Sequence, residues 1–270
     1  MVSLTADPDR PFFGACLKVA RAKTHAINME QTLRDWIATE PIELRHKHDK
    51  QTGHYTIEAR LLQPIPVFVP AILGDAIHNL WSALDLMTCR LIAEWNPGIP
   101  VTNSRFMFPF TDRGPAAVEQ CIRSTIPNIP PYALRLYRRL KPYKGGNKIL
   151  STLRELDVCD KHRLIIPTVA SAGSLLVTFL MRLPGEDKPV PSPRIAIRSE
   201  TPTIIADDYV EIYAGPARKP NANLKEEYGI EIAFGEGPAF GRNLVKELDT
   251  MGAHVTKIIN IFDRACFPQA

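Results

Sequence analysis

Two short segments of the sequence hold side chains that could do chemistry. The first, GDAIHNLWSALDLM at residues 74–87, places polar residues inside an otherwise apolar run. At about 100° per residue these polar positions fall within one arc of a helix, roughly 120° wide. An ordinary solvent-facing stripe is rich in Lys, Arg and Glu, yet none of the three occurs from Val67 to Cys89. We therefore expect the stripe to face protein or an enclosed cleft; its members are Asp75, His78, Asn79, Ser82 and Asp85.

The second segment, RELDVCDKHR at residues 154–163, supplies cations at the end of another expected helix. A buried carboxylate is costly unless donors or cations lie near it, so we expect the two segments to meet. A histidine among carboxylates can act as a general acid or base, and lysine and arginine can hold an anion. The candidate catalytic residues are His78, Asp75, Asp85, Asp160 and His162, and the candidate ligand-binding residues are Asn79, Ser82, Lys161 and Arg163.

The same residues fit two other interpretations. In the first, the two segments form a structural network of hydrogen bonds and ion pairs that fixes the register of two packed helices. In the second, oxygen and imidazole ligands hold a divalent ion; the ligand candidates are Asp75, His78, Asp85 and Asp160. Their spacing matches no strong metal motif such as H-E-x-x-H, so we predict no metal ion and no cofactor.

Residues 120–154 form a basic segment, with eight Lys and Arg residues and no Asp or Glu. Tyr132, Tyr137 and Tyr143 lie among these charges, a combination that can bind phosphates while the rings stack on bases. The alternative is a solvated helix face whose tyrosines belong to the core. The turn KGGN, at residues 144–147, could also offer backbone N–H groups to a phosphate. We assign ligand-binding roles in this segment to Arg138, Arg139 and Lys144.

The stripe and the later motif also resemble a known pattern. LGDAIHNLWSALDLM, followed by LKPY and then LDVCDKHR, resembles a family of uncharacterised bacterial and phage proteins. Its members carry a G-D-x-x-H-N-L-R-S-A-L-D-H-L helix and a later D-K-H-R, and the match covers residues 54–166. The family has no settled activity. The resemblance implies roles for Gly74, Asp75, His78, Asn79, Ser82 and Asp85, and for Asp160, Lys161, His162 and Arg163.

This chain departs from that family pattern at two positions. Trp81 stands where Arg is usual and Leu86 where His is usual, so two polar side chains are missing from or beside the stripe. A more distant similarity is to HEPN helical domains, many of which are ribonucleases or components of defence systems. Their hallmark, an Arg followed after four to six residues by a His, is absent, since only three residues separate Arg21 from His25.

The elements that must position these residues follow from periodicity. Helical spacing of apolar residues predicts helices at residues 12–38, 69–95, 114–124, 130–140, 147–161 and 239–265. A β-hairpin is predicted near 42–61, and β-rich runs between 163 and 238 predict a small antiparallel sheet. The resulting class is α+β: an N-terminal helical bundle with an inserted β-hairpin, then the sheet, then a C-terminal helix packing back on the bundle. We expect a single domain, with a helical part at 1–162, a β-rich part at 163–238 and the last helix at 239–265.

Composition narrows the functional class. With 45% hydrophobic and 23% charged residues, the chain reads as a soluble globular protein. No run approaches the ~18 apolar residues of a membrane span, and the N-terminus lacks the order of a signal peptide, so we expect a cytoplasmic protein with no membrane contact. The five cysteines are scattered and never form C-x-x-C, which argues against a disulfide framework. The sequence is compatible with a homo-oligomer.

Two functions follow from these features. The favoured hypothesis is a binding or assembly protein for an anionic partner, either nucleic acid or an acidic protein, in which the polar stripe is structural. The alternative is a hydrolase or ribonuclease-like enzyme that acts on a phosphate-bearing substrate. In it, His78 works with Asp75 or Asp85 while Lys161 and Arg163 bind the anion.

Overall fold

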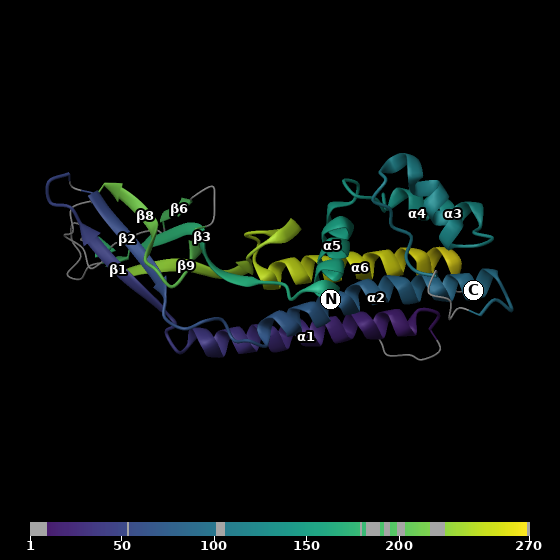
Figure 1. Ribbon diagram of the computed structural model, residues 1–270, viewed down its shortest axis with the longest axis horizontal. Helices are drawn as coiled ribbons and strands as arrows, with labels where there is room; N and C mark the ends of the chain where they lie inside the picture. The colour runs from purple at the N-terminus through teal and green to yellow at the C-terminus, as the bar shows by residue number, and fades with distance from the viewer. Residues whose placement is uncertain are drawn as a thin grey trace. The chain divides into compact units, whose positions relative to one another are not determined.

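The computed structural model describes residues 10–52, 54–100, 106–178, 180–181, 190–191, 195–198, 203–216 and 225–268 (Figure 1). The chain forms two compact units. Unit 1 consists of Met1–Gln31, Pro70–Ile165 and Val245–Ala270, and unit 2 of Thr32–Val69 and Ile166–Leu244. The predicted α+β class is confirmed, whereas the single domain stays a prediction. None of the described helices has the length and apolar character needed to cross a bilayer.

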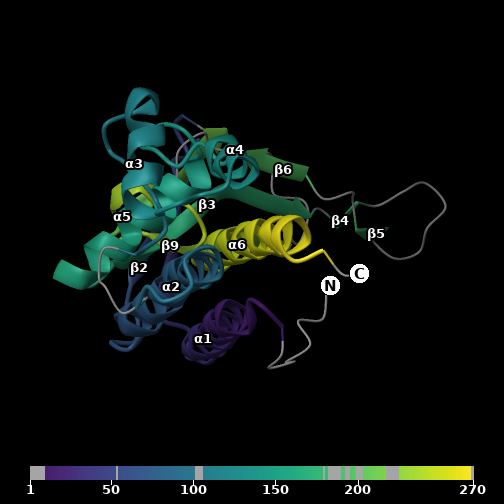
Figure 2. The same cartoon turned by 90° about the vertical axis from the view of Figure 1, so that its right-hand side faces the viewer.

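Three long helices form the framework of unit 1: α1 (Phe13–Ile37), which belongs to this unit up to Gln31, α2 (Val69–Trp95) and α6 (Leu244–Cys266). They run side by side, with α2 packed between the other two (Figures 1 and 2). Each turns an apolar stripe inward at helical spacing, as Val19, Ala22 and Ala26 do on α1. Because α2 has neighbours on several sides, most of its apolar residues are fully buried.

Three shorter helices complete unit 1: α3 (Val118–Thr125), which follows the 3-10 turn η1 (Pro115–Ala117), α4 (Pro131–Arg139) and α5 (Lys148–His162). Tyr137 of α4 is fully buried, and its hydroxyl lies 3.1 Å from that of Thr88 on α2. The helix α5 begins at the N-cap Asn147, whose Oδ1 accepts hydrogen bonds from two backbone N–H groups of the first turn. The Nδ2 of Asn147 lies 2.9 Å from Nε2 of His254, which ties α5 to α6.

Unit 2 is built from antiparallel strands. The hairpin of β1 (Ile42–His48) and β2 (His54–Leu61) has β8 (Val210–Pro216) as its third strand. In a second sheet, β3 (Pro167–Thr178) pairs with β6 (Ile195–Arg198), β7 (Ile204–Ile205) and β9 (Lys225–Phe234). Two short strands, β4 (Leu180–Met181) and β5 (Val190–Pro191), pair with each other in a separate two-stranded sheet.

The last helix starts later than the sequence predicts, at Leu244 instead of residue 239. The 3-10 turn η2 (Gly237–Ala239) ends where the helix is predicted to begin, and Gly241, two residues later, has a φ of 72°, which a helix does not accommodate. Phe240 and Asn243 then form bridges with the end of β9. Pairing with a strand therefore delays the helix, although the sequence from Pro238 onward has helical periodicity.

Candidate functional site

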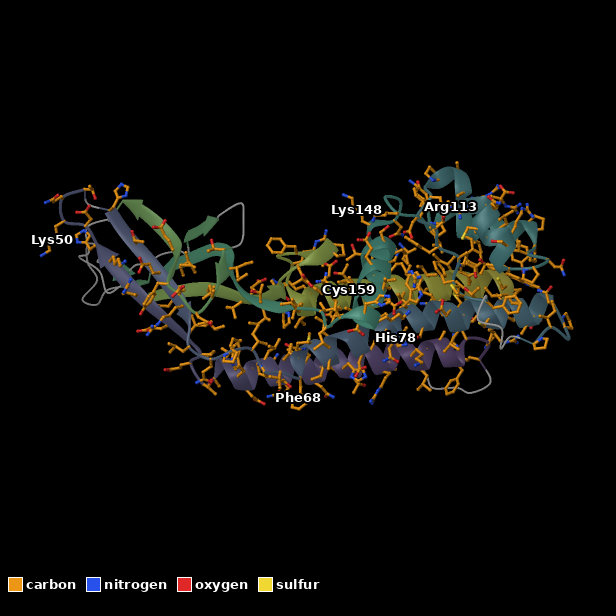
Figure 3. All side chains as sticks on the ribbon, viewed as in Figure 1. Lys50, Phe68, His78, Arg113, Lys148 and Cys159 are labelled. Atoms are coloured by element: carbon orange, nitrogen blue, oxygen red, sulfur yellow. The ribbon has the colours of Figure 1, made fainter. Side chains whose placement is uncertain are left out.

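The predicted meeting of α2 and α5 takes place around one buried carboxylate, that of Asp157, which contacts His78. Figure 3 labels His78 of α2 and, on α5, Cys159. The side chain of Asp157 is fully buried. Oδ1 lies 2.9 Å from Nδ1 of His78, while Oδ2 accepts from Nζ of Lys161 at 2.7 Å and from Nη1 of Arg154 at 3.3 Å. The two cations reach it because positions three and four residues apart share a helix face. Asp157 therefore has the partners that a buried charge requires.

The hydrogen bond to Asp157 also fixes the chemistry of His78. A carboxylate only accepts, so Nδ1 of His78 carries the proton that it donates, and in a neutral ring Nε2 is left with a free lone pair. Nε2 faces the hydroxyl of Ser82 at 3.3 Å, one helical turn further along α2. The side chain of His78 is 49% exposed, so a ligand can approach it. The carboxylate of Asp157 thus contacts one nitrogen of the His78 imidazole, and the hydroxyl of Ser82 faces the other. A general base is held and oriented by a carboxylate in this way.

Asp85 has a different partner from the one expected. Its Oδ1 accepts a hydrogen bond from the backbone N–H of the buried Phe108 at 2.8 Å, so it holds the loop after residue 105 against α2. Burial raises the pKa of Asp85 above its ordinary value, and the nearby charge of Asp157 raises it further. Asp85 stabilises the loop, and the carboxylate that orients His78 is Asp157.

Asp75 and Asp160 lie beside the central cluster. Asp160 packs directly against the backbone of Gly74, in the space that a Cβ at this position would occupy. Burial raises the pKa of Asp160, the charges of Asp75 and Asp157 raise it further, and His78 and Lys161 oppose them. Asp75 is exposed on α2. The glycine thus lets the two helices approach closely at this crossing.

The remaining predicted residues make local contacts. Asn79 is nearly buried and its Nδ2 donates to the carbonyl oxygen of Asp75, within its own helix. His162 is exposed at the end of α5, and Arg163, also exposed, is the C-cap residue. The structure therefore brings together His78, Ser82 and Lys161 around Asp157, with Asp75 and Asp160 at the edge.

Two residues of the cluster, Asp157 and Arg154, belong to the segment that was expected to meet α2, but not to the residues predicted to be catalytic or ligand-binding. The signal for Asp157 was its spacing, since Arg154 precedes it by three residues and Lys161 follows it by four. Arg154 also places its guanidinium 5.0 Å from the centre of the Trp81 ring. Trp81 itself is buried and packs edge-on against Phe108 and Phe110. The Trp81 ring on α2 thus packs against an arginine that comes from another helix, α5.

The basic segment is partly neutralised by acidic neighbours. Arg138 forms an ion pair with Glu119 on α3, and Nε of Arg123 lies 3.0 Å from the same carboxylate. Nζ of Lys144 lies 3.9 Å from Glu155. Arg139 is exposed and has no ion pair among the residues that the structure describes. Glu119 lies one residue before the basic segment at 120–154. Its carboxylate nevertheless pairs with two arginines of that segment, so the surface is less positive than the sequence indicates.

The turn at residues 141–147 is closed by backbone hydrogen bonds, within the turn and to Thr111. The N–H groups of Tyr143 and Asn147 both donate to the carbonyl of Lys141, and those of Lys144 and Gly146 donate to Thr111 and Tyr143. These donors are therefore not offered to a phosphate, contrary to the interpretation of this turn as an anion cradle. Tyr137 is also unable to stack on a base, because it is fully buried.

The donor set does not form a metal centre. Within the described part of the chain, no group of three or more His, Cys, Asp or Glu side chains is arranged to hold a metal ion. No protein-family model, curated protein or solved structure matches the chain, so the family resemblance of its motifs stays a prediction.

Proposed function

We propose that the chain is a hydrolase or ribonuclease-like enzyme that acts on a phosphate-bearing substrate, with His78 as the general base. The observation that carries this proposal is the 2.9 Å contact between Nδ1 of the half-exposed His78 and the buried carboxylate of Asp157. A base held in one tautomer by a buried acid, with its other nitrogen accessible, is the arrangement that proton abstraction needs.

Each residue of the cluster has a place in this mechanism. Nε2 of His78 takes the proton from the attacking hydroxyl, and Asp157 stabilises the imidazolium that forms. Lys161 and Arg154 retain N–H donors beyond those bound to Asp157, and their side chains are 45% and 32% exposed. These donors suit the equatorial oxygens of a phosphate group as charge develops on them. Ser82 lies where the attacking group would stand, either as that group or as a partner that positions a water molecule.

The contacts of His78 favour an enzyme over a purely structural network. A structural role accounts for Asp157, Arg154 and Lys161, but it gives no reason for the exposed edge of His78 to face a hydroxyl. The ion pair between Glu119 and Arg138 partly neutralises the basic segment, which weakens the hypothesis of a protein that binds an anionic partner through this segment.

The test is a comparison of two histidine variants. Purified protein is assayed with bis(p-nitrophenyl) phosphate and with a fluorescein-labelled single-stranded RNA, and each variant is also melted. His78→Ala should lose turnover while its melting temperature stays within a few degrees of the parent, because His78 is half exposed. His48→Ala, which removes an exposed histidine in unit 2, is the matched control and should keep full activity. Turnover that survives His78→Ala would remove the proposal.

A second candidate, the binding of an anionic macromolecule, rests on the unpaired part of the basic segment. Among the described residues, Arg135, Arg139, Lys141 and Lys148 are exposed and form no ion pairs. A surface of this kind binds nucleic acid with an affinity that falls steeply as salt rises. Arg139→Glu should weaken the binding of a 20-nucleotide RNA and flatten its salt dependence, whereas Arg21→Glu on α1 should do neither. Affinity that is indifferent to salt would exclude this function.

A further inference from the structure

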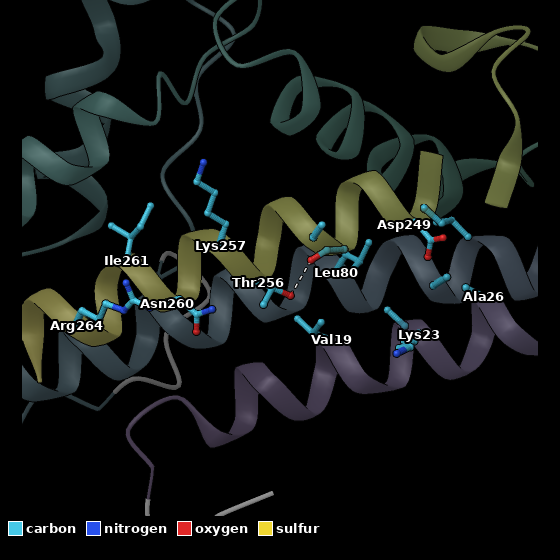
Figure 4. A pocket seen from close by; sticks show the side chains of 15 residues that line it. Val19, Lys23, Ala26, Leu80, Asp249, Thr256, Lys257, Asn260, Ile261 and Arg264 are labelled. Atoms are coloured by element: carbon cyan, nitrogen blue, oxygen red, sulfur yellow. Dashed lines mark hydrogen bonds between the residues drawn. The ribbon is translucent and has the colours of Figure 1, made fainter. Parts of the chain in front are cut away.

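Unit 1 has a groove on the other face of α2 from His78 (Figure 4). It lies between α1 and α6, with Ala76 and Leu80 of α2 as its floor, and has a volume of about 610 Å³. At 100° per residue, Ala76 and Leu80 point roughly opposite to His78 and Ser82. The groove is therefore independent of the proposed catalytic site.

Small side chains keep the groove open. Ala22 and Ala26 line the α1 wall, and Gly252 and Ala253 line the α6 wall. A Cβ added to Gly252 would meet only the Leu80 side chain, at 3.9 Å, so there is free space above this residue. From Asp249 to Arg264 the α6 wall runs for about 22 Å, at 1.5 Å per residue. The result is a long apolar trough with unfilled volume.

Four polar residues lie toward the two ends of the groove, while Thr256, whose hydroxyl donates to the carbonyl oxygen of Gly252, lies between them (Figure 4). Asn260 and Arg264 lie at one end, and Lys23 and Asp249 lie toward the other. Asn260 is half-buried and Arg264 is exposed, and neither has a hydrogen bond or ion pair within the part of the chain that the structure describes. Lys23 and Arg264 face the groove near its ends against the single carboxylate of Asp249, while Lys257 also lines it but extends its ammonium group away from α1 (Figure 4). The charge of the rim therefore favours an anion.

The dimensions favour a slender ligand over a helix. A helix about 10 Å across and 22 Å long occupies on the order of 1,700 Å³, nearly three times the volume of the groove, so most of it would stay outside. Small-molecule sites typically enclose between about 300 and 1,000 Å³, are mainly apolar and have a few polar groups that fix orientation. An extended alkyl chain with one charged end meets all of these conditions.

We propose that this groove binds one long-chain fatty carboxylate. Its alkyl chain lies along the alanine-lined walls, and its carboxylate accepts hydrogen bonds from Arg264 and Asn260. Binding is driven by the transfer of methylene groups out of water, and the positive charge of Arg264 selects a negatively charged head group.

Isothermal titration calorimetry with sodium decanoate and sodium dodecanoate, each below its micelle-forming concentration, tests the proposal. We expect one molecule bound per chain, with a Kd that falls about four- to fifteenfold for the two added methylenes. Dodecyltrimethylammonium, which has the same alkyl chain and the opposite charge, should bind at least tenfold more weakly. Equal affinity for the two charge types, or the uptake of many molecules per chain, would overturn the proposal.

Two pairs of variants locate the binding. Gly252→Leu fills the free space and should abolish binding, while Ala20→Leu adds the same side chain outside the groove and should leave it unchanged. Arg264→Glu should raise the Kd about fivefold or more, and Arg21→Glu should not. Circular dichroism confirms that each variant is folded.

Two results for these variants would contradict the inference. Undiminished dodecanoate binding by folded Gly252→Leu would place the ligand elsewhere. A parent protein that sediments as a dimer, and that Gly252→Leu converts to a monomer, would show that a second copy of the chain covers the groove instead.

Discussion

Replacement of Asp157 by Asn tests the central cluster most directly, because it keeps the shape of the side chain and changes its hydrogen-bonding pattern. The carboxylate accepts on both oxygens, from His78 on one side and from Lys161 and Arg154 on the other. An amide has one accepting oxygen and one donating nitrogen. If the oxygen stays with the two cations, the NH₂ group must face Nδ1 of His78. The ring then has to move its proton to Nε2, which removes the free lone pair from the exposed side.

The cost in stability follows from the exposure of the three partners. A hydrogen bond to a charged group contributes about 1.5–3 kcal/mol when it is buried. Here the partner side chains are 32% to 49% exposed, so water replaces much of each lost interaction. The variant also avoids the cost of burying a charge. We expect Asp157→Asn to lower the free energy of unfolding by about 2 kcal/mol, which is small enough to leave the protein folded.

Two measurements check this prediction. Urea denaturation gives the change in stability, and ¹⁵N NMR of histidine-labelled protein at neutral pH gives the tautomer of His78, assigned with His78→Ala. We expect the proton on Nδ1 in the parent and on Nε2 in the variant, together with loss of turnover. An Nδ1 proton in both proteins, with activity retained, would refute the orienting role of Asp157. Arg123→Gln, which neutralises an exposed residue that pairs with Glu119, is the control for a general effect of charge.

Three further predictions follow from individual contacts. Asp85→Ala should cost about 1–3 kcal/mol in urea denaturation, because the buried N–H of Phe108 loses its acceptor. Asp85→Asn should restore most of that stability. Because the pKa of Asp85 is raised in the folded protein, its contribution to stability falls as pH rises from the ordinary pKa of 3.8 through the raised pKa, and Asp85→Asn should flatten this fall. Burial, with a smaller contribution from Lys257, lowers the pKa of His254 below its ordinary 6.5. The protein should therefore lose stability as pH falls through 6.5 and below. His254→Gln keeps an acceptor for Asn147 and should reduce this loss in melting experiments. Gly74→Ala gains about 1 kcal/mol of helix propensity but displaces Asp160. Thermal melts should therefore show the substitution to be more favourable in an Asp160→Ala background than in the parent. Equal effects in both backgrounds would contradict the close approach of Asp160 to Gly74.

The helices could be predicted from the sequence because their signals are local. The α2 boundaries agree at both ends with those predicted, since Pro70 suits a first turn and the Asn96 to Gly98 stretch ends the pattern. Helical periodicity also placed α1 and α5 within about a residue of their observed limits. The start of α6 was wrong because the bridges of Phe240 and Asn243 with β9 depend on residues distant from the helix pattern.

The partners within the site were harder to predict because they depend on the rotation of two helices about their axes. The sequence placed His78 on a polar stripe and located the cationic segment, and both are present at the contact. It could not show which of Asp157 and Asp160, three residues apart on α5, faces His78. Nor could it show that Asp85 is engaged by the Phe108 backbone, since that bond depends on the path of a loop.

The position of Trp81 gives this protein a built-in optical probe. The indole is 2% exposed and lies 5.0 Å from the guanidinium of Arg154, which is itself bound to Asp157. A nearby positive charge shifts the emission of an indole, so an anion that draws Arg154 away should change the fluorescence of Trp81. The chain has three tryptophans, and replacing Trp36 and Trp95 by Phe would leave Trp81 as the single emitter. Candidate substrates could then be screened by titration in a cuvette, before any product assay exists for them.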